Sequence, residues 1–206
     1  MQALSAAEFQ QATAVSRETL ERLQTYLALL ARWQKKINLV GPSTLADPWR
    51  RHVLDSAQLL PHIAAGSTLV DLGSGAGFPG LVLAIMAQLD VHLVESDLRK
   101  TVFLQEAARL TGTAVEIHNQ RIESLPALTA DVITARALAP LPLLCKLAQP
   151  LCHAETVCLF LKGRSAQEEL TETQKQTTLQ ATLIASQTDS EGVLIKVRNL
   201  HHDVAR

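Results

Sequence analysis

Three glycines at two-residue spacing, Gly73, Gly75 and Gly77, follow a short apolar run that contains Asp71. Such a turn lets the backbone approach a nucleotide-like ligand, because glycine has no Cβ and tolerates positive φ. Glu95 follows about twenty residues later, at the end of the next apolar run, where it would meet a ribose diol. The turn and the acid together predict a cofactor that contains adenosine.

The acidic approach to the turn bears on which cofactor binds. A pyrophosphate needs the free helix N-terminus that follows such a turn, so a dinucleotide enzyme stays possible, as does a purely structural turn. The run from Asp71 to Gly77, DLGSGAG, is similar to the first motif of class I S-adenosylmethionine-dependent methyltransferases. S-adenosylmethionine lacks a pyrophosphate and carries a positive sulfonium, which tolerates a nearby carboxylate such as Asp71. We therefore favour a methyltransferase.

Alternating apolar runs and helical patterns surround this turn from Thr68 onward. The predicted strands are 68–72, 91–95, 114–118, 131–134 and 156–161, with a closing hairpin of 181–187 and 192–199. The predicted helices are 79–88, 98–110 stopped by Gly112, 141–151 and 166–178. This alternation predicts a mostly parallel, doubly wound α/β sheet of Rossmann-like type, in which ligands bind beyond the carboxyl ends of the strands.

The first 65 residues are predicted to be helical. Ser5 and Glu8 have the spacing of a capping box at a helix start. Apolar residues then recur at three- and four-residue steps at Leu20, Leu23, Leu27 and Leu30. Gly41-Pro42-Ser43 breaks the pattern, and a shorter helix is expected from about Trp49 to Leu60, before Pro61. We expect one domain over 1–206, with an N-terminal helical extension (1–65) on a methyltransferase core (66–206).

Composition limits the class of protein. Of the 206 residues, 47% are hydrophobic and 19% are charged, which favours a globular chain. The net charge of −1 argues against coating nucleic acid by bulk electrostatics, so any such role rests on local placement. Three cysteines (Cys145, Cys152 and Cys158) without CxxC spacing predict buried thiols, with neither a disulfide framework nor a zinc site. No other metal is expected. The same cysteine pattern fits a reducing cytoplasm, and the first residues show no secretory signal.

Six ordered segments resemble the RsmG (GidB) family of bacterial 16S ribosomal RNA guanine-N7 methyltransferases. They are Trp33–Leu39 (WQKKINL), Arg51–Ser56 (RHVLDS), Gly73–Gly80 (GSGAGFPG), Leu93–Ser96 with Lys100, Thr134–Ala137 (TARA) and Leu161–Gly163 (LKG). Several ordered matches are more specific than any one of them. One departure is Glu95, where such enzymes also use aspartate; either acid accepts from a ribose diol.

The resemblance implies methyl transfer from S-adenosylmethionine to N7 of one guanine, nucleotide 527 of 16S rRNA in the usual bacterial numbering. It also implies the small ribosomal subunit or its assembly intermediate as the partner, with no membrane and no oligomer expected. The alternatives are a methyltransferase of another RNA or of a small molecule, and a non-catalytic nucleotide-binding regulator.

By position, the cofactor would be held by residues beyond four strand ends: Gly73, Gly75, Gly77, Phe78, Glu95, Ile122, Glu123 and Arg136. Arg136 is also the candidate for positioning the target base, by a phosphate contact or by O6 and N7 of guanine. No general base is expected, because guanine N7 has no proton to remove. The plainer interpretation of Arg136 is a surface arginine in an ion pair.

Basic residues on the same edge are candidates for contacts with RNA. Lys100 and Lys162 are the main ones, with Arg50, Arg51 and Arg99 as a phosphate-binding rim. Each could instead be solvated.

His52, Asp55 and Ser56 suggest a hydrolase triad, but their spacing within one helical turn fits local hydrogen bonds and an architectural role better. Trp33 and Trp49 are expected to pack in the core.

Overall fold

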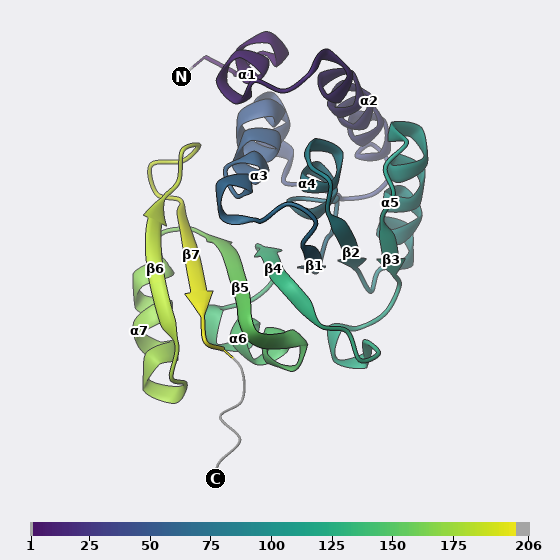
Figure 1. Cartoon of the computed structure of the whole chain (residues 1–206). Helices are drawn as coiled ribbons and strands as arrows, with labels where there is room; N and C mark the ends of the chain where they lie inside the picture. Colours follow the sequence, from purple (N-terminus) through teal and green to yellow (C-terminus); the bar gives the residue numbers. More distant parts are fainter. Residues whose placement is uncertain (1, 201–206) are drawn as a thin grey trace.

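The computed structural model describes residues 2–200, which contain a seven-stranded sheet of order β3-β2-β1-β4-β5-β7-β6. The strands are β1 (Thr68–Leu72), β2 (Asp90–Val94), β3 (Glu116–His118), β4 (Ala130–Arg136), β5 (Cys152–Lys162), β6 (Gln180–Ala185) and β7 (Val193–Arg198). The first five are parallel, whereas β7 runs antiparallel to β5 and β6 (Figure 1). The order reverses at β1, which lies between β2 and β4, so a crevice is expected at the carboxyl end of β1.

Strand residues alternate between two apolar layers, because successive side chains point to opposite faces. Leu69 and Val132 join the layer under the N-terminal helices, and Val70 and Ile133 join the layer on the other face. By the same alternation, Arg136 at the end of β4 belongs to the face that the N-terminal helices cover.

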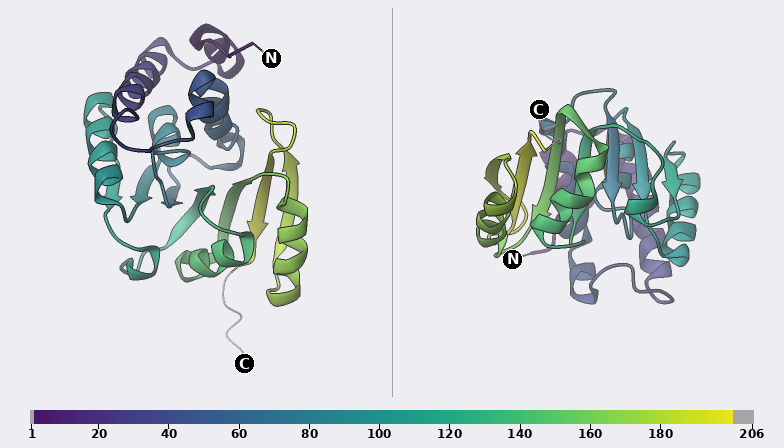
Figure 2. Two further views of the ribbon diagram at one scale, coloured as in Figure 1. Left: turned by 180° about the vertical axis from the view of Figure 1, so that it is seen from behind. Right: turned by 90° about the horizontal axis from the view of Figure 1, so that it is seen from below.

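Helices cover both faces of the sheet (Figures 1 and 2). One face carries α1 (Ala6–Thr13), α2 (Arg17–Trp33), α3 (Asp55–Ala57), α4 (Gly80–Met86) and α5 (Leu98–Thr111); the other carries α6 (Leu141–Ala148) and α7 (Ala166–Gln176). None of the helices in the described part of the chain has the length and apolar character needed to cross a membrane. The α/β, Rossmann-like fold predicted from the sequence is confirmed.

The N-terminal segment packs on the rest of the protein through α2, which contacts α4 and α5. The capping box at Ser5 is present, and Leu23 and Tyr26 are fully buried. Trp33 packs edge-on against Phe103, and Trp49 packs against Phe9, so both tryptophans lie in aromatic packing as expected.

Several predicted boundaries differ from the structure, and three of the differences have a clear local cause. The helix expected over Trp49–Leu60 is a π-helical turn (Trp49–Leu54) that runs into α3. Pro61 does not end it but opens a 3-10 turn (Leu60–His62), because an early turn position needs no N–H. Strand β5 begins at Cys152, earlier than expected, because a register shift lets Cys152 pair with Ala130.

Candidate functional site

A cleft of about 860 Å³ opens at the carboxyl edge of β1, β2 and β4. Its walls come from the glycine-rich turn, the segments after β2, β3 and β4, the N-terminal extension and the β6–β7 connection. All but one of the site residues predicted from the sequence line it: Gly73, Gly75, Phe78, Glu95, Lys100, Ile122, Glu123, Arg136 and Lys162. The topology therefore brings together residues that lie up to 89 positions apart in the sequence, from Gly73 to Lys162.

The carboxylate of Glu95 is fixed against the glycine-rich turn. Its Oε2 accepts from the backbone N–H of Gly75 across 2.9 Å, and its Oε1 accepts from the N–H of Asp97 across 2.8 Å. Gly75 has a φ of +56°, a conformation that suits glycine. A carboxylate has about four acceptor positions, so two remain for a ligand such as a diol.

Gly77 is the predicted site residue that does not line the cleft. With a φ of +94°, it faces the protein interior, where an added Cβ would lie 2.9 Å from Cβ of Leu81 and 3.1 Å from the hydroxyl oxygen of Tyr26. The described cleft therefore gives no support to a contact between Gly77 and the cofactor, since an added Cβ at Gly77 would meet the layer behind the turn. The regular spacing of the glycines hid this difference, because spacing does not show which way a turn faces.

Tyr26 supports the turn from behind. Its hydroxyl donates to the carbonyl oxygen of Ala76, and its ring packs at 5.2 Å from the ring of Phe78. Burial raises the pKa of Tyr26 well above its usual value, so the phenol stays protonated and able to donate. Helix α2 therefore holds the glycine-rich turn in place.

Asp71 lies beneath the cleft rather than in it. Its Oδ1 accepts from the Thr134 hydroxyl across 2.7 Å, its Oδ2 lies 3.3 Å from the backbone N of Gly80, and the residue is fully buried. Burial raises its pKa to about 6, against the lowering effect of these hydrogen bonds. The carboxylate therefore joins β1, β4 and the start of α4.

Arg136 is held by the N-terminal extension. Its Nη2 lies 3.1 Å from Nδ1 of His52, and its Nη1 lies 3.0 Å from the carbonyl oxygen of Arg51 and 3.4 Å from Oδ2 of Asp55. The Arg136 side chain is 18% exposed. The plain ion-pair interpretation thus accounts for one contact, and the remaining contacts hold the guanidinium at the cleft.

The tautomer of His52 follows from its partners. A guanidinium only donates, so Nδ1 of His52 accepts and Nε2 carries the hydrogen. Nε2 then donates to the Thr44 hydroxyl across 2.8 Å, and Thr44 donates to the carbonyl of Gly41 across 2.6 Å. Burial, reinforced by the charges of Arg136 and Arg51, lowers the pKa of His52 to about 3, so the ring is neutral.

Phe78 completes this arrangement. The His52 ring stacks on the Phe78 ring with centroids 4.6 Å apart, and the Arg136 guanidinium carbon lies 5.0 Å from the same ring centroid. The aromatic face thus contacts both groups, and a cation above such a face is attracted to it.

The extension is in turn tied to the β6–β7 connection. Asp55 accepts from the Thr188 hydroxyl across 2.7 Å, and Arg51 pairs with Asp189 across 2.6 Å. The Ser56 hydroxyl donates to the backbone oxygen of His52 across 2.7 Å and contacts neither Asp55 nor the His52 ring. His52, Asp55 and Ser56 are therefore architectural, as their spacing predicted, and not a nucleophile assembly.

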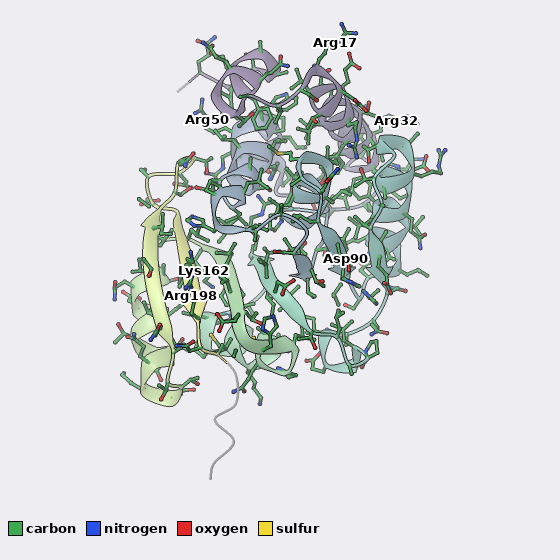
Figure 3. All side chains as sticks on the ribbon, in the orientation of Figure 1. Arg17, Arg32, Arg50, Asp90, Lys162 and Arg198 are labelled. Carbon is green, nitrogen blue, oxygen red and sulfur yellow. The ribbon has the colours of Figure 1, made fainter. Side chains whose placement is uncertain are left out.

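Most of the basic residues predicted to meet RNA are already paired with carboxylates. Lys162 pairs with Glu169 across 2.7 Å and donates to the carbonyl of Ala139 across 2.9 Å. The other pairs are Arg50 with Asp47, Arg51 with Asp189 and Arg99 with Asp97. Lys100, half-buried at the cleft, has no carboxylate within 4.0 Å among residues 2–200. Arg17 and Arg32 extend outward from α2, away from Lys162 (Figure 3).

Thr44, Thr188 and Asp189 were missed from the sequence alone, because only the fold brings them to His52, Asp55 and Arg51. Thr44 and Asp189 also line the cleft.

The cysteines were expected to be buried free thiols. All three are free, Cys145 and Cys158 are buried, and Cys152 is partly buried. Burial raises the pKa of the Cys145 thiol to about 12, so that thiol is unreactive.

This strand order, with a glycine-rich turn after β1 and an acid after β2, defines the Rossmann-like methyltransferase class of fold. A solved S-adenosylmethionine-dependent methyltransferase from Aquifex aeolicus superposes with a TM-score of 0.62 at 15% identity, covering 76% of this chain and 95% of that one. At this identity the likeness shows the fold alone.

The family model for rRNA small subunit methyltransferase G matches residues 19–193. Proteins named ribosomal RNA small subunit methyltransferase G are similar over most of their length. The Rhodospirillum rubrum protein is 53% identical, covering 91% of this chain and 94% of its own, and the Paramagnetospirillum magneticum protein is 56% identical, covering 90% and 91%. The chain belongs to this family of methyltransferases.

Proposed function

We propose that this protein transfers the methyl group of S-adenosylmethionine to N7 of a single guanine, nucleotide 527, in the 16S rRNA of the small ribosomal subunit. The observation that carries the proposal is a single cleft in which the turn at Gly73–Gly75, Glu95 and Arg136 meet, in a chain of this family. The protein would act in the cytoplasm, where ribosomal subunits are assembled.

The cofactor end of the cleft suits S-adenosylmethionine. Glu95 offers the ribose diol acceptor positions that its two backbone contacts leave free. Ile122 and Glu123, on the 3-10 turn after β3, would border the adenine. The N-terminal end of α4 already has a protein acceptor, because the backbone N–H of Gly80 faces the buried carboxylate of Asp71. A pyrophosphate would therefore not find a free N–H group of Gly80 at this helix end. This favours S-adenosylmethionine over a dinucleotide as the cofactor.

The chemistry of guanine N7 needs alignment more than acid or base groups. N7 attacks the methyl carbon with a lone pair, the carbon–sulfur bond breaks, and the sulfonium becomes a neutral thioether. No proton moves in this step, so a fixed geometry in a desolvated cleft supplies the acceleration. His52 does not act as a base, because its Nδ1 already accepts from Arg136.

Arg136 would position the target nucleotide. A guanidinium that bound N7 would occupy the lone pair that must reach the methyl carbon. Its contact is therefore to O6 of the guanine or to a phosphate. The contacts with His52, Asp55 and the Arg51 carbonyl leave Nε and one Nη2 hydrogen for that purpose.

The substrate we propose is a partly assembled particle rather than short naked RNA. The net charge is −1, and the basic residues Arg50, Arg51, Arg99 and Lys162 are paired with carboxylates. Few phosphate contacts remain available, so shape presented by the particle must contribute to binding. Methylation of a bare stem-loop oligonucleotide as efficient as that of the particle would contradict this part of the proposal.

The test is release of S-adenosylhomocysteine by purified protein mixed with S-adenosylmethionine and small subunits from cells that lack the enzyme. We expect one equivalent per subunit, and none with subunits that already carry the modification. Release with both kinds of subunit, or with neither, would contradict the proposed target. In the second case, tight S-adenosylmethionine binding would direct the search to another RNA or a small molecule.

A further inference from the structure

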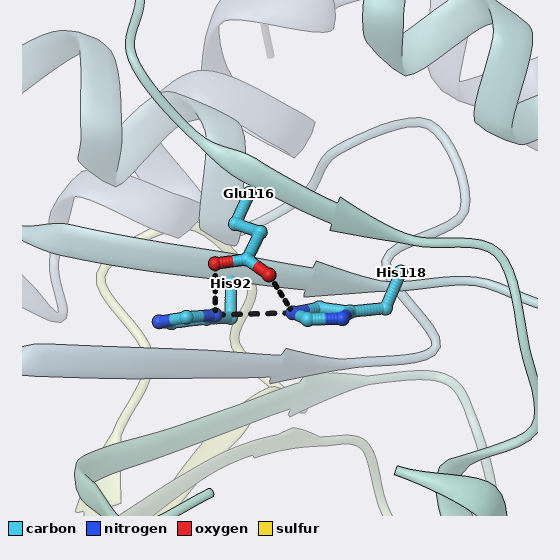
Figure 4. Close-up of side chains that lie close together, drawn as sticks. All are labelled: His92, Glu116 and His118. Carbon is cyan, nitrogen blue, oxygen red and sulfur yellow. Dashed lines mark hydrogen bonds and ion pairs between the residues drawn. The ribbon is translucent and has the colours of Figure 1, made fainter. Parts of the chain in front are cut away.

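Three side chains with metal-ligand chemistry converge on one face of the sheet edge formed by β2 and β3: His92, Glu116 and His118 (Figure 4). One ligand atom from each residue lies within 4.8 Å of the other two. Within the described part of the chain, no other group of three histidine, cysteine or acidic side chains lies this close together. None of the three lines the methyl-transfer cleft.

The strand register explains why they meet. His92 on β2 is the direct parallel partner of Glu116 on β3, and His118 lies two residues beyond Glu116. Residues two apart on a strand share a face, so all three side chains lie on the same side. They project on the side of the sheet opposite Ile117, which packs under the N-terminal helices.

The distances between the ligand atoms fit one metal ion. Nδ1 of His92 lies 3.0 Å from Nε2 of His118. Oε2 of Glu116 lies 3.5 Å from Nδ1 of His92, and Oε1 of Glu116 lies 3.6 Å from Nε2 of His118. Ligands about 2.0–2.1 Å from a tetrahedral zinc ion lie about 3.3 Å from one another. These distances are close to that separation, and one ligand atom from each of the three residues lies within 4.8 Å of the others.

We propose that His92, Glu116 and His118 form a binding site for a divalent transition-metal ion, with Zn²⁺ as the expected ion and water as its fourth ligand. Two imidazoles with one carboxylate suit zinc, whereas Mg²⁺ and Ca²⁺ prefer oxygen ligands. Nickel and copper ions bind two imidazoles and a carboxylate as zinc does and would compete with it for this site, whereas magnesium would not.

The surroundings support the ligand geometry. The His92 and His118 side chains are 9% and 12% exposed, so their positions are fixed, whereas that of Glu116 is 64% exposed and leaves an entry path from solvent. An Asp90 carboxylate oxygen lies 3.6 Å from Nε2 of His92, the nitrogen that would not bind the ion. A carboxylate in that place favours the Nε2–H tautomer and frees Nδ1 to coordinate.

Protons balance without an outside base. With Nε2–H on His92, the bond between the rings is donated by Nε2–H of His118 to Nδ1 of His92. When the ion binds, Nε2 of His118 gives its proton to water and Nδ1 takes one up from water, so the ring stays neutral and Nε2 coordinates. The ion would then join β3, a three-residue edge strand, to β2.

The experiment is calorimetric titration of untagged protein with ZnCl₂, with MgCl₂ as the contrasting ion. His201 and His202, outside the described residues, are replaced by glutamine in every protein compared, so that they cannot contribute. We expect one Zn²⁺ per chain, no Mg²⁺ binding, and a Tm raised by about 5–10 °C at 100 times the dissociation constant. Titration with CoCl₂ should give the visible absorption of four-coordinate cobalt.

Variants assign the site. Glu116→Gln and His118→Gln should each weaken zinc binding at least about 100-fold, and Asp90→Asn about tenfold. Glu116 is largely exposed, so Glu116→Gln tests the site even if a histidine variant is unstable. His153→Gln is the matched control, because His153 is a histidine that pairs with one acid, Asp131; it should bind zinc like the parent. Equal binding by the parent and Glu116→Gln, or no binding by the parent, would overturn the proposal.

Discussion

Nδ1 of His52 accepts a hydrogen bond from Nη2 of Arg136 across 3.1 Å, although 84 residues separate the two in the sequence. The contact joins the N-terminal extension to the end of β4, at the edge of the cleft. The extension therefore builds part of the cleft wall rather than merely covering the sheet. The resemblance segments RHVLDS and TARA meet at this contact.

His52→Phe tests whether this contact positions Arg136. The phenyl ring can keep the stack on Phe78 but offers Arg136 no acceptor. We expect kcat/KM for the ribosomal substrate to fall about 10- to 100-fold, as for a misplaced positioning group. The dissociation constant for S-adenosylmethionine, measured by calorimetry, should change less than about threefold.

His52→Asn is the matched variant, because Oδ1 of asparagine can take the place of Nδ1. It should recover most of the activity that His52→Phe loses. If both variants lose activity equally, or both keep it, then the acceptor atom is not what matters.

Arg136→Ala removes the group proposed to position the guanine. Transfer should fall at least about 100-fold with cofactor binding retained, since the cofactor contacts of Glu95 remain. The free energy of unfolding should also fall by about 1–3 kcal/mol, because Asp55 and the Arg51 carbonyl lose a donor. Arg136→Lys keeps the charge but not the fork, and should restore stability more than transfer. Normal turnover by Arg136→Ala would remove Arg136 from the site.

Glu95→Ala tests the proposed ribose contact. Loss of hydrogen bonds to a charged acceptor should raise the dissociation constant for S-adenosylmethionine about 10- to 100-fold. Glu155→Gln, an exposed acid on β5, is the control and should bind normally. Unchanged cofactor binding by Glu95→Ala would refute the proposed role of this carboxylate.

The buried, neutral His52 predicts acid sensitivity. Its pKa is lowered to about 3 from an ordinary value near 6.5, so its share of stability is full above pH 6.5 and is lost as pH falls. Between pH 7 and pH 4 the wild-type protein should lose about 3 kcal/mol more unfolding free energy than His52→Phe does. Denaturant unfolding at a series of pH values measures this difference.

The comparison with His52→Phe is needed because Asp71 acts in the opposite sense. Its pKa is raised to about 6, so its burial destabilises the protein as pH rises from about 4 to 6. Both proteins contain Asp71, so its contribution cancels in the difference. Identical pH profiles for the two proteins would contradict a neutral, buried His52.

Much of the fold could be predicted from periodicity alone. Strand β1 has the predicted bounds Thr68–Leu72, and α5 ends at Gly112 in the left-handed conformation, as the glycine suggested. The boundaries that differ have local causes. Polar His153 and Glu155 hide the first half of β5, and the π-helical turn at Trp49–Leu54 has no sequence signature that separates it from an ordinary helix.

The site was predictable where it follows strand ends and not where it depends on tertiary contacts. Glu95 and Arg136 follow the ends of β2 and β4, so topology alone brings them to one edge. That Gly77 faces inward, that Asp71 lies beneath the cleft and that Lys162 is paired with Glu169 depend on packing between distant segments. The His92–Glu116–His118 cluster was missed for the same reason, because register and not spacing brings it together.

The most direct test of the proposed reaction is to map the methyl group. Purified protein is incubated with labelled S-adenosylmethionine and small subunits from cells that lack the enzyme, and the modified nucleotide is then identified by chemical cleavage at 7-methylguanine. The proposal predicts label at N7 of one guanine, nucleotide 527, and no label with Arg136→Ala. Label on another atom or another nucleotide, or turnover unchanged in that variant, would contradict it.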